Sequence, residues 1–181
     1  FGDEESFVDT LLIRYYSRRR MLAATCDGRL AAMVHLLPFR TELGRTTYIY
    51  GVATAPEYRG RGLASQLMRE AVRLIDARGD DAAILIPTPG QPWLRDFYGR
   101  FGFAGDCPVR FSAPDDFDFG TGDPAADRAM VRLRNRTTAV AIPAAVMTSP
   151  DGTATALHTE AEQTTPFIPT SLTAVWARIH D

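Results

Sequence analysis

The stretch VATAPEYRGRGLASQLM, residues 52–68, joins the end of an expected strand to the start of an expected helix. Gly60, Gly62, Arg59 and Arg61 stand immediately before that helix. The first-turn amides of a helix carry partial positive charge and lack partners inside the helix, so they bind anions. Glycine lets an anion approach this backbone because it has no Cβ, and arginine adds charge suited to oxygen anions. The stretch therefore predicts a local site for a phosphate-like group.

Two familiar nucleotide-binding loops do not fit this stretch well. A P-loop requires Lys followed by Ser or Thr after its last glycine, and GRGLASQ offers no such pair. A dinucleotide-binding fold places its glycines directly after the strand and an acidic residue at the end of the next strand. Here APEY intervenes, and Asp80 and Asp81 precede the next strand. Nucleotide binding is therefore a weak rival interpretation.

The sequence on either side of this stretch predicts a mixed α/β arrangement. Apolar residues at helical spacing indicate an amphipathic helix over 7–16, and Asp27-Gly28 is a strong hairpin signal between two strands. A third strand, 46–54, implies an antiparallel meander. Strand 46–54, helix 62–78 and strand 82–86 form a β-α-β unit, whose strands are expected to be parallel neighbours.

The sequence after this unit contains one more clear helix. Pro92 suits the first turn of a helix with an aromatic face, which we expect to end near Gly102. Residues 112–127 are rich in Pro, Gly and Asp and are expected to form a loop. Two later segments, TTAVAIPAAVM and TATALHTEAE, are interpreted as strands about an SPDG turn.

Composition indicates one compact soluble domain and argues against two classes of partner. The chain has 181 residues, of which 45% are hydrophobic, and this is enough for a buried core. A net charge of −2 and a pI near 5.9 argue against nucleic acid or an anionic membrane as partner. No run approaches the ~20 apolar residues of a membrane span.

Cysteine usage and the start of the chain indicate the compartment. Cys26 and Cys107 match no metal or redox spacing, which favours two free thiols in a reducing compartment over a disulfide. The first residues, FGDEESF, have neither the basic nor the long apolar region of a signal peptide. We therefore expect a cytoplasmic protein without a metal site. Because Phe1 is not an initiator methionine, we leave open that a first strand and helix precede it.

Two segments of the chain match a pair of motifs found together in one enzyme family. RGRGLA, residues 59–64, fits the pattern Gln/Arg-x-x-Gly-x-Gly/Ala position by position. FYGRFGF, residues 97–103, fits an aromatic helix ending in Phe-Tyr-x-x-x-Gly-Phe. In this order and at roughly this separation, the motifs resemble those of the GNAT superfamily of acyl-CoA-dependent N-acyltransferases. The resemblance covers about residues 5–105.

The resemblance implies the fold and the domain organisation. It implies an α/β (α+β) fold with a mixed, mainly antiparallel sheet flanked by helices and a splayed pair of parallel strands at the cofactor site. Residues 1–110 would form the acetyltransferase core. Residues 111–181, which match the family poorly, would complete the same domain with C-terminal strands and loops.

The resemblance also implies that acetyl-CoA binds as cosubstrate. The backbone amides of the loop would hold its pyrophosphate, and its pantetheine arm would lie between strands 46–54 and 82–86, with one strand amide steadying the oxyanion. Pro87, which lacks an amide hydrogen, suits the point where these strands part, although a simple strand terminator is an equal alternative. The expected cofactor-binding residues are Val52, Ala53, Thr54, Arg59, Gly60, Arg61, Gly62, Leu63 and Ala64.

The reaction that the resemblance implies is direct transfer of the acetyl group to a primary amine of a small molecule or peptide. The family match makes Tyr98 the general acid for the departing thiolate, with a packed core tyrosine as the alternative. Many relatives have a glutamate base on the strand before the loop, but TTYIYG contains no carboxylate. Glu42, His35, Tyr48 or an ordered water remain open as the base.

Three other interpretations remain open. A non-catalytic acyl-CoA sensor would keep the loop but have an inert acceptor cleft, and a nucleotide-binding protein would bind a dinucleotide but not coenzyme A. Homodimerisation is also open.

The run Arg18-Arg19-Arg20 could bind an acidic partner, but three arginines after a helix more often form a solvated end that complements the helix dipole.

Overall fold

The computed structural model describes residues 5–134, 147–148, 154–155 and 169–177. The chain divides into two units, Phe1–Arg134 with Ile168–Asp181 and Asn135–Phe167. In the second unit, β7 (Met147–Thr148) and β8 (Ala154–Thr155) pair antiparallel. The SPDG turn and most of the two strands predicted around it lie outside the described residues.

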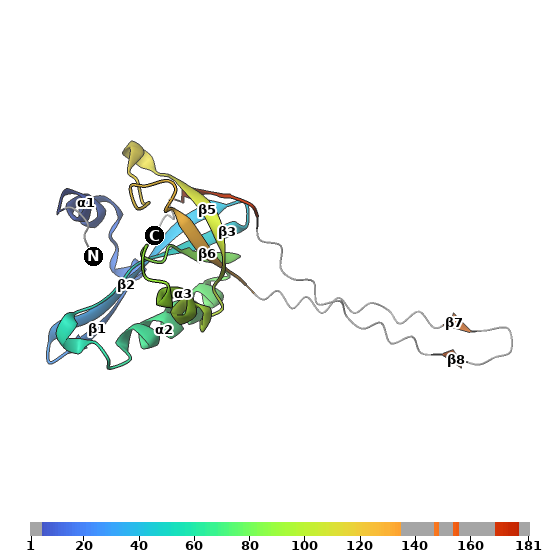
Figure 1. Cartoon of the computed structure of the whole chain (residues 1–181), viewed down its shortest axis with the longest axis horizontal. Helices are drawn as coiled ribbons and strands as arrows, with labels where there is room; N and C mark the ends of the chain where they lie inside the picture. The colour runs from blue at the N-terminus through green and yellow to red at the C-terminus, as the bar shows by residue number, and fades with distance from the viewer. Residues whose placement is uncertain (1–4, 135–146, 149–153, 156–168, 178–181) are drawn as a thin grey trace. The chain divides into compact units, whose positions relative to one another are not determined.

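The first unit holds a seven-stranded mixed sheet with the order β1-β2-β3-β4-β6-β5-β9 (Figure 1). Its elements in chain order are α1 (Glu5–Thr10), a π-helical segment (Leu11–Tyr15), a 3-10 turn (Arg18–Arg20), β1 (Met21–Cys26), β2 (Arg29–Thr41), β3 (Gly44–Thr54), a 3-10 turn (Pro56–Tyr58), α2 (Leu63–Arg78), β4 (Ala82–Leu85), α3 (Trp93–Gly99), β5 (Ala104–Ser112), a 3-10 turn (Pro114–Asp116), β6 (Arg128–Leu133) and β9 (Leu172–Trp176). No helix in the described ranges is long and apolar enough to cross a membrane.

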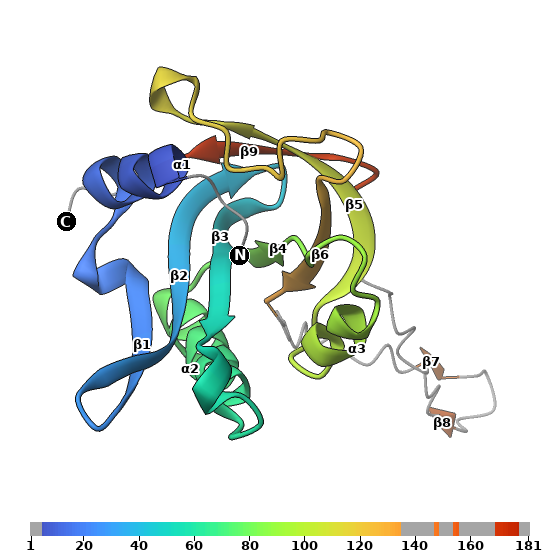
Figure 2. The same ribbon diagram turned by 60° about the vertical axis from the view of Figure 1, so that its left-hand side comes forward.

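Most strand pairs in the sheet are antiparallel, and β3/β4 and β5/β9 are the parallel pairs of the described sheet. Strand β9 also pairs with the end of β2, where Phe39 lies opposite Trp176 (Figure 2). The sheet therefore curls until its last strand contacts its second strand. The predicted mixed, mainly antiparallel sheet flanked by helices is confirmed.

The N-terminal two thirds of this unit follow the sequence patterns. The predicted helix over 7–16 is present as α1 and the π-helical segment, and the hairpin turns at Asp27-Gly28, both of which have positive φ. Strand β3, helix α2 and strand β4 form the predicted β-α-β unit with parallel strands. Helix α2 ends at Gly79, whose φ is 73° and whose amide hydrogen-bonds back into the last turn.

The core lies on both faces of the sheet. Helices α2 and α3 cover one face together, while α1 lies apart from them (Figure 1). The π-helical segment and the loop around Phe119 cover the other face. Strand β4 is buried along its whole length because both faces are covered, which explains its uniformly apolar sequence. Strand β4 therefore lies between two packed layers of the core.

Candidate active site

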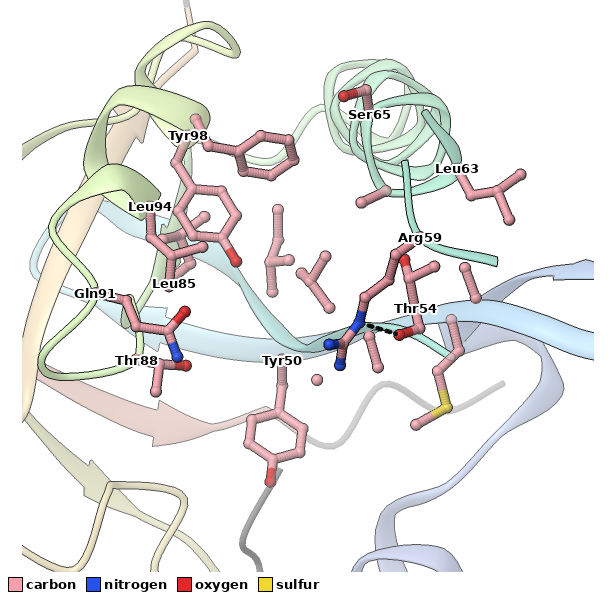
Figure 3. A pocket seen from close by; sticks show the side chains of 18 of the residues that line it. Tyr50, Thr54, Arg59, Leu63, Ser65, Leu85, Thr88, Gln91, Leu94 and Tyr98 are labelled. Atoms are coloured by element: carbon pink, nitrogen blue, oxygen red, sulfur yellow. Dashed lines mark hydrogen bonds between the residues drawn. The ribbon is translucent and has the colours of Figure 1, made fainter. Parts of the chain in front are cut away.

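A cavity of about 1170 Å³ opens between β3, α3 and the start of α2 (Figure 3). A pocket for one small molecule usually measures roughly 300–1,000 Å³, so this cavity has room for a large cosubstrate and an acceptor. Its lining comes from β2 (residues 30–33), β3 and the following turn (48–56), the glycine loop and first turn of α2 (58–60 and 62–65), the segment 85–98, and Gly120 and Thr121. Pro87 and some other members of the 85–98 segment do not line it.

Strands β3 and β4 part beside this cavity. They pair in parallel only from Thr46 to Tyr48 on β3 and from Ala82 to Ile84 on β4. Strand β3 continues to Thr54, so no strand among the described residues pairs with its second half on that side. Backbone groups of an unpaired strand edge need hydrogen-bond partners. The parting of the strands thus leaves an edge that suits an extended, amide-containing ligand.

A β-bulge at Gly51 bends β3 where it borders the cavity. The register with β2 shifts between Met33 and His35, so that Gly51 and Val52 together lie opposite one residue of β2. Gly51 has a φ of 63°, which glycine adopts without strain. A bulge of this kind disrupts the ladder locally and leaves the extra residue of the strand unpaired. A glycine inside a strand pattern was the available sequence signal for it.

The glycine loop leaves the first-turn amides of α2 without a side-chain cap. Gly62 is the N-cap residue, with a φ of 75°, and the first amide bonded within the helix is that of Gln66, which donates to the Gly62 carbonyl at 3.1 Å. A Cβ built at Gly60 or at Gly62 would meet no atom within 4 Å. The protein therefore keeps open space over uncapped amides, which fits a pyrophosphate bound there.

The two loop arginines lie differently. Arg59 lines the cavity, and its Nε donates a 3.3 Å hydrogen bond to the carbonyl oxygen of Thr54, which holds the guanidinium across the end of β3 (Figure 3). Arg61 does not line the cavity. Its guanidinium lies 5.1 Å from the ring centroid of Tyr58 and donates to the Glu57 carbonyl. Only Arg59 thus brings its side-chain charge to the cavity.

Tyr98 points its hydroxyl into the cavity from α3 (Figure 3). The ring is 7% exposed because Leu94 and Tyr98, four residues apart, form the face of α3 that packs on the core. Burial raises the pKa of the Tyr98 hydroxyl from 10.0 to about 12. The phenol therefore keeps its proton at neutral pH, as a general acid must.

The raised pKa of Tyr98 gives a titration that can be measured. The folded protein favours the neutral phenol, so this contribution to stability is complete below pH 10 and is lost as the pH rises towards 12. The measurement is the phenolate absorbance of the wild type as a function of pH, from which that of Tyr98→Phe is subtracted. We expect the midpoint of this difference to lie about two pH units above that of an exposed tyrosine. A difference signal centred near pH 10 would show that the hydroxyl is solvated instead.

The side chains considered as the base do not gather at the cavity. Both carboxylate oxygens of Glu42 accept from the backbone amide of Thr173, at 2.9 and 3.1 Å, and this bond holds the pKa of Glu42 below its usual value. His35 is 5% exposed, and burial lowers its pKa, so it is neutral at pH 7. Neither residue lines the cavity, whereas Tyr48 does and donates to the Phe119 carbonyl.

Several polar residues of the cavity were not predicted from the sequence. They are Tyr50, Tyr58, Ser65, Thr88, Gln91 and Thr121. Thr121 comes from the loop between β5 and β6, and no local pattern in that loop indicates proximity to the cavity. Within the described part of the chain, no Asp, Glu or His lines the cavity. The same part contains no group of three or more His, Cys, Asp or Glu side chains placed to hold a metal ion.

Comparison with known proteins shows the family of the chain. The family model for the acetyltransferase (GNAT) domain matches residues 1–105. Among curated protein sequences, none is significantly similar to this chain.

Three solved structures illustrate the structural similarity. A protein described only as an acetyltransferase is 17% identical, with a TM-score of 0.50 over 74% of this chain and 82% of that one, and it shares the fold. The GNAT family N-acetyltransferase YhbS from Escherichia coli, in complex with CoA, is 22% identical, with a TM-score of 0.49 over 71% of this chain. A GCN5-related N-acetyltransferase from Kribbella flavida is 29% identical, with a TM-score of 0.41 over 48% of this chain.

The chain spans 65% of the E. coli protein and 23% of the Kribbella flavida protein. The family model, by contrast, matches more than half of this chain and includes the glycine loop, α2 and α3. The protein therefore belongs to the GNAT acetyltransferase family, as the two sequence motifs predict.

Proposed function

We propose that this protein transfers an acetyl group from acetyl-CoA directly to a primary amine. The observation that supports this best is that one cavity combines the uncapped start of α2, the half of β3 that β4 does not pair with, and the hydroxyl of Tyr98. Acetyl-CoA supplies the activated acetyl group. We also propose that the protein works in the cytoplasm. Cys26 and Cys107 are both free thiols, as is usual in a reducing compartment.

The residues that would hold acetyl-CoA lie on two elements. The amides from Arg59 to Ala64 would bind the pyrophosphate, with the guanidinium of Arg59 adding positive charge. The backbone of Val52, Ala53 and Thr54 would pair with the pantetheine arm along the unpaired edge of β3. A backbone amide at the bulge would stabilise negative charge on the acetyl oxygen as it develops.

Tyr98, and a lining whose described residues include no acid or histidine, determine how protons move in this proposal. Tyr98 holds a proton on its hydroxyl at neutral pH and would give it to the departing thiolate. The attacking amine must be neutral, and no carboxylate or imidazole of the described residues lines the cavity to accept its proton. A water molecule is therefore our choice for the base, and amines that are already neutral near pH 7 are favoured.

This reasoning predicts the kind of acceptor. An α-amine, with a pKa of about 7.7–8.0, is neutral far more often at pH 7 than a lysine-type amine, with a pKa of about 10.4. We expect kcat/KM at pH 7 to favour phenylalanine amide over an α-blocked lysine by about 10²-fold. The preference is expected to shrink as the pH approaches 10. Equal rates at pH 7, or better rates with a polyamine, would contradict it.

The alternative is a non-catalytic acyl-CoA sensor, which the absence of an acid or histidine among the described lining residues favours. Release of free thiol from acetyl-CoA distinguishes the two functions. Thiol release that depends on an added amine supports the enzyme, whereas tight binding of acetyl-CoA without turnover of any amine supports the sensor.

A further inference from the structure

A second cavity, of about 360 Å³, lies beside the C-terminal end of α2. Five arginines line it: Arg19, Arg20, Arg40, Arg45 and Arg78. The helix is roughly 24 Å long at 1.5 Å per residue, so this end is remote from the glycine loop. The two cavities share no lining residue. We propose that this arginine cavity binds a small phosphate-bearing anion.

The local charge of the arginine cavity contrasts with that of the whole chain. Five of its lining residues are arginines, and Asp80 is the one carboxylate among them, whereas the full sequence carries a net charge of −2. Asp80 is buried and already bonded, since it accepts from Thr47 at 2.7 Å and pairs with Arg45 at 3.1 Å. Its charge therefore orients Arg45 and offsets only a small part of the positive potential.

Contacts between separate segments hold three of these arginines around the cavity. Arg45 donates to the carbonyl of Arg78 at 3.3 Å, and Arg78 donates to the carbonyl of Arg19 at 2.9 Å. The guanidinium of Arg20 lies 5.5 Å from the ring centroid of Trp176 on β9. Preorganised donors lose less entropy when a ligand binds. The dipole of α2 favours an arginine in its last turn and so explains the position of Arg78. It does not explain the other four arginines, which belong to other segments.

Two further arginines have donors to offer. Arg19 and Arg40 are exposed, and their guanidinium groups form no ion pair within the described part of the chain. Each guanidinium presents donors in a planar fork that matches two oxygens of a phosphate. A phosphate dianion carries two negative charges, so it complements this concentration of positive charge better than a single carboxylate does. The small, concave volume suits a small molecule rather than an extended polyanion.

The experiment is calorimetric titration of the whole chain with inorganic phosphate at constant ionic strength set by chloride. We expect saturable binding, and we expect Arg19→Gln and Arg40→Gln each to weaken it about tenfold or more, the usual effect of losing a charge-assisted bond. The matched control is Arg69→Gln, which removes the same charge from an exposed position of α2 outside the cavity. That variant is expected to bind phosphate as the wild type does.

A second control distinguishes this cavity from the glycine loop, which is itself suited to phosphate. Binding that survives Gly62→Val but falls in Arg40→Gln assigns the phosphate to the arginine cavity. Binding that is lost in Gly62→Val and kept in Arg40→Gln assigns it to the loop and overturns the proposal. Equal weakening by Arg69→Gln, or no saturable binding to the wild type, also overturns it. If the protein binds a nucleic acid but not inorganic phosphate, the proposal is overturned as well.

Discussion

Replacing Tyr98 with phenylalanine is expected to lower kcat by roughly 10²–10⁴-fold, the usual range for the loss of a general acid. The affinity for acetyl-CoA is expected to stay within about twofold, because the change removes one hydroxyl and leaves the packed ring of α3 in place. Burial keeps this hydroxyl protonated up to a pKa of about 12, so the loss is expected throughout the neutral range.

The measurement is steady-state turnover together with calorimetric binding of acetyl-CoA. Tyr15→Phe is the matched control, because it removes another buried tyrosine hydroxyl, one that donates to the Pro114 carbonyl and lies away from the cavity. Its kcat is expected to remain near that of the wild type. If chemistry limits the rate and Tyr98→Phe still turns over within about threefold of the wild type, Tyr98 is a core residue only.

Replacing Gly62 with valine is expected to abolish measurable binding of coenzyme A. The protein has no atom within 4 Å of a Cβ at this position, so the added side chain fills the space that we assign to the pyrophosphate. Displacing the phosphates from two or more amides is expected to weaken binding by about 10²-fold or more. Calorimetry with coenzyme A measures the loss.

The chain offers a close control for backbone strain at Gly62. Gly28 in the first hairpin has a φ of 74°, against 75° at Gly62, and a Cβ there also meets no atom within 4 Å. Gly28→Val is expected to lower the melting temperature as Gly62→Val does and to bind coenzyme A normally. The corresponding alanine pair makes the same comparison with less strain. Wild-type affinity in a folded Gly62→Val protein would remove the loop from the site.

Local signals account for the part of the site that the sequence predicted. One signal is the pair Gly60 and Gly62, and the other is the aromatic run from Phe97 to Phe103. Each signal depends on one turn or helix only, so a position beside the cavity could be inferred without knowing the whole sheet. Their roles in binding and catalysis remain predictions. Arg61 shows the limit of such inference, since the motif includes it but its side chain stacks on Tyr58 and does not line the cavity.

Non-local pairing explains what the sequence did not predict. Strand β5 contains Gly105 and Pro108, which usually interrupt strands. A register shift against β6 between Ala104 and Cys107 accommodates Gly105, while Pro108 stays in register opposite Arg128. Strands β6 and β9 are short and have no turn signal that fixes their partners. The arginine cavity has the same origin. The run from Arg18 to Arg20 was visible in the sequence, but only the fold brings Arg40 and Arg78 beside it.

The pairing of β9 with both β5 and the end of β2 has a consequence for how the chain folds. Phe39 and Trp176 lie opposite each other although they are far apart in the sequence. Contacts of such long range form slowly, because closing a long loop costs entropy before the contact repays it. During synthesis on the ribosome, the end of β2 and one edge of β5 therefore lack this partner until β9 has emerged. Exposed strand edges promote aggregation, so the cellular yield of this protein is expected to depend on translation speed and on chaperones.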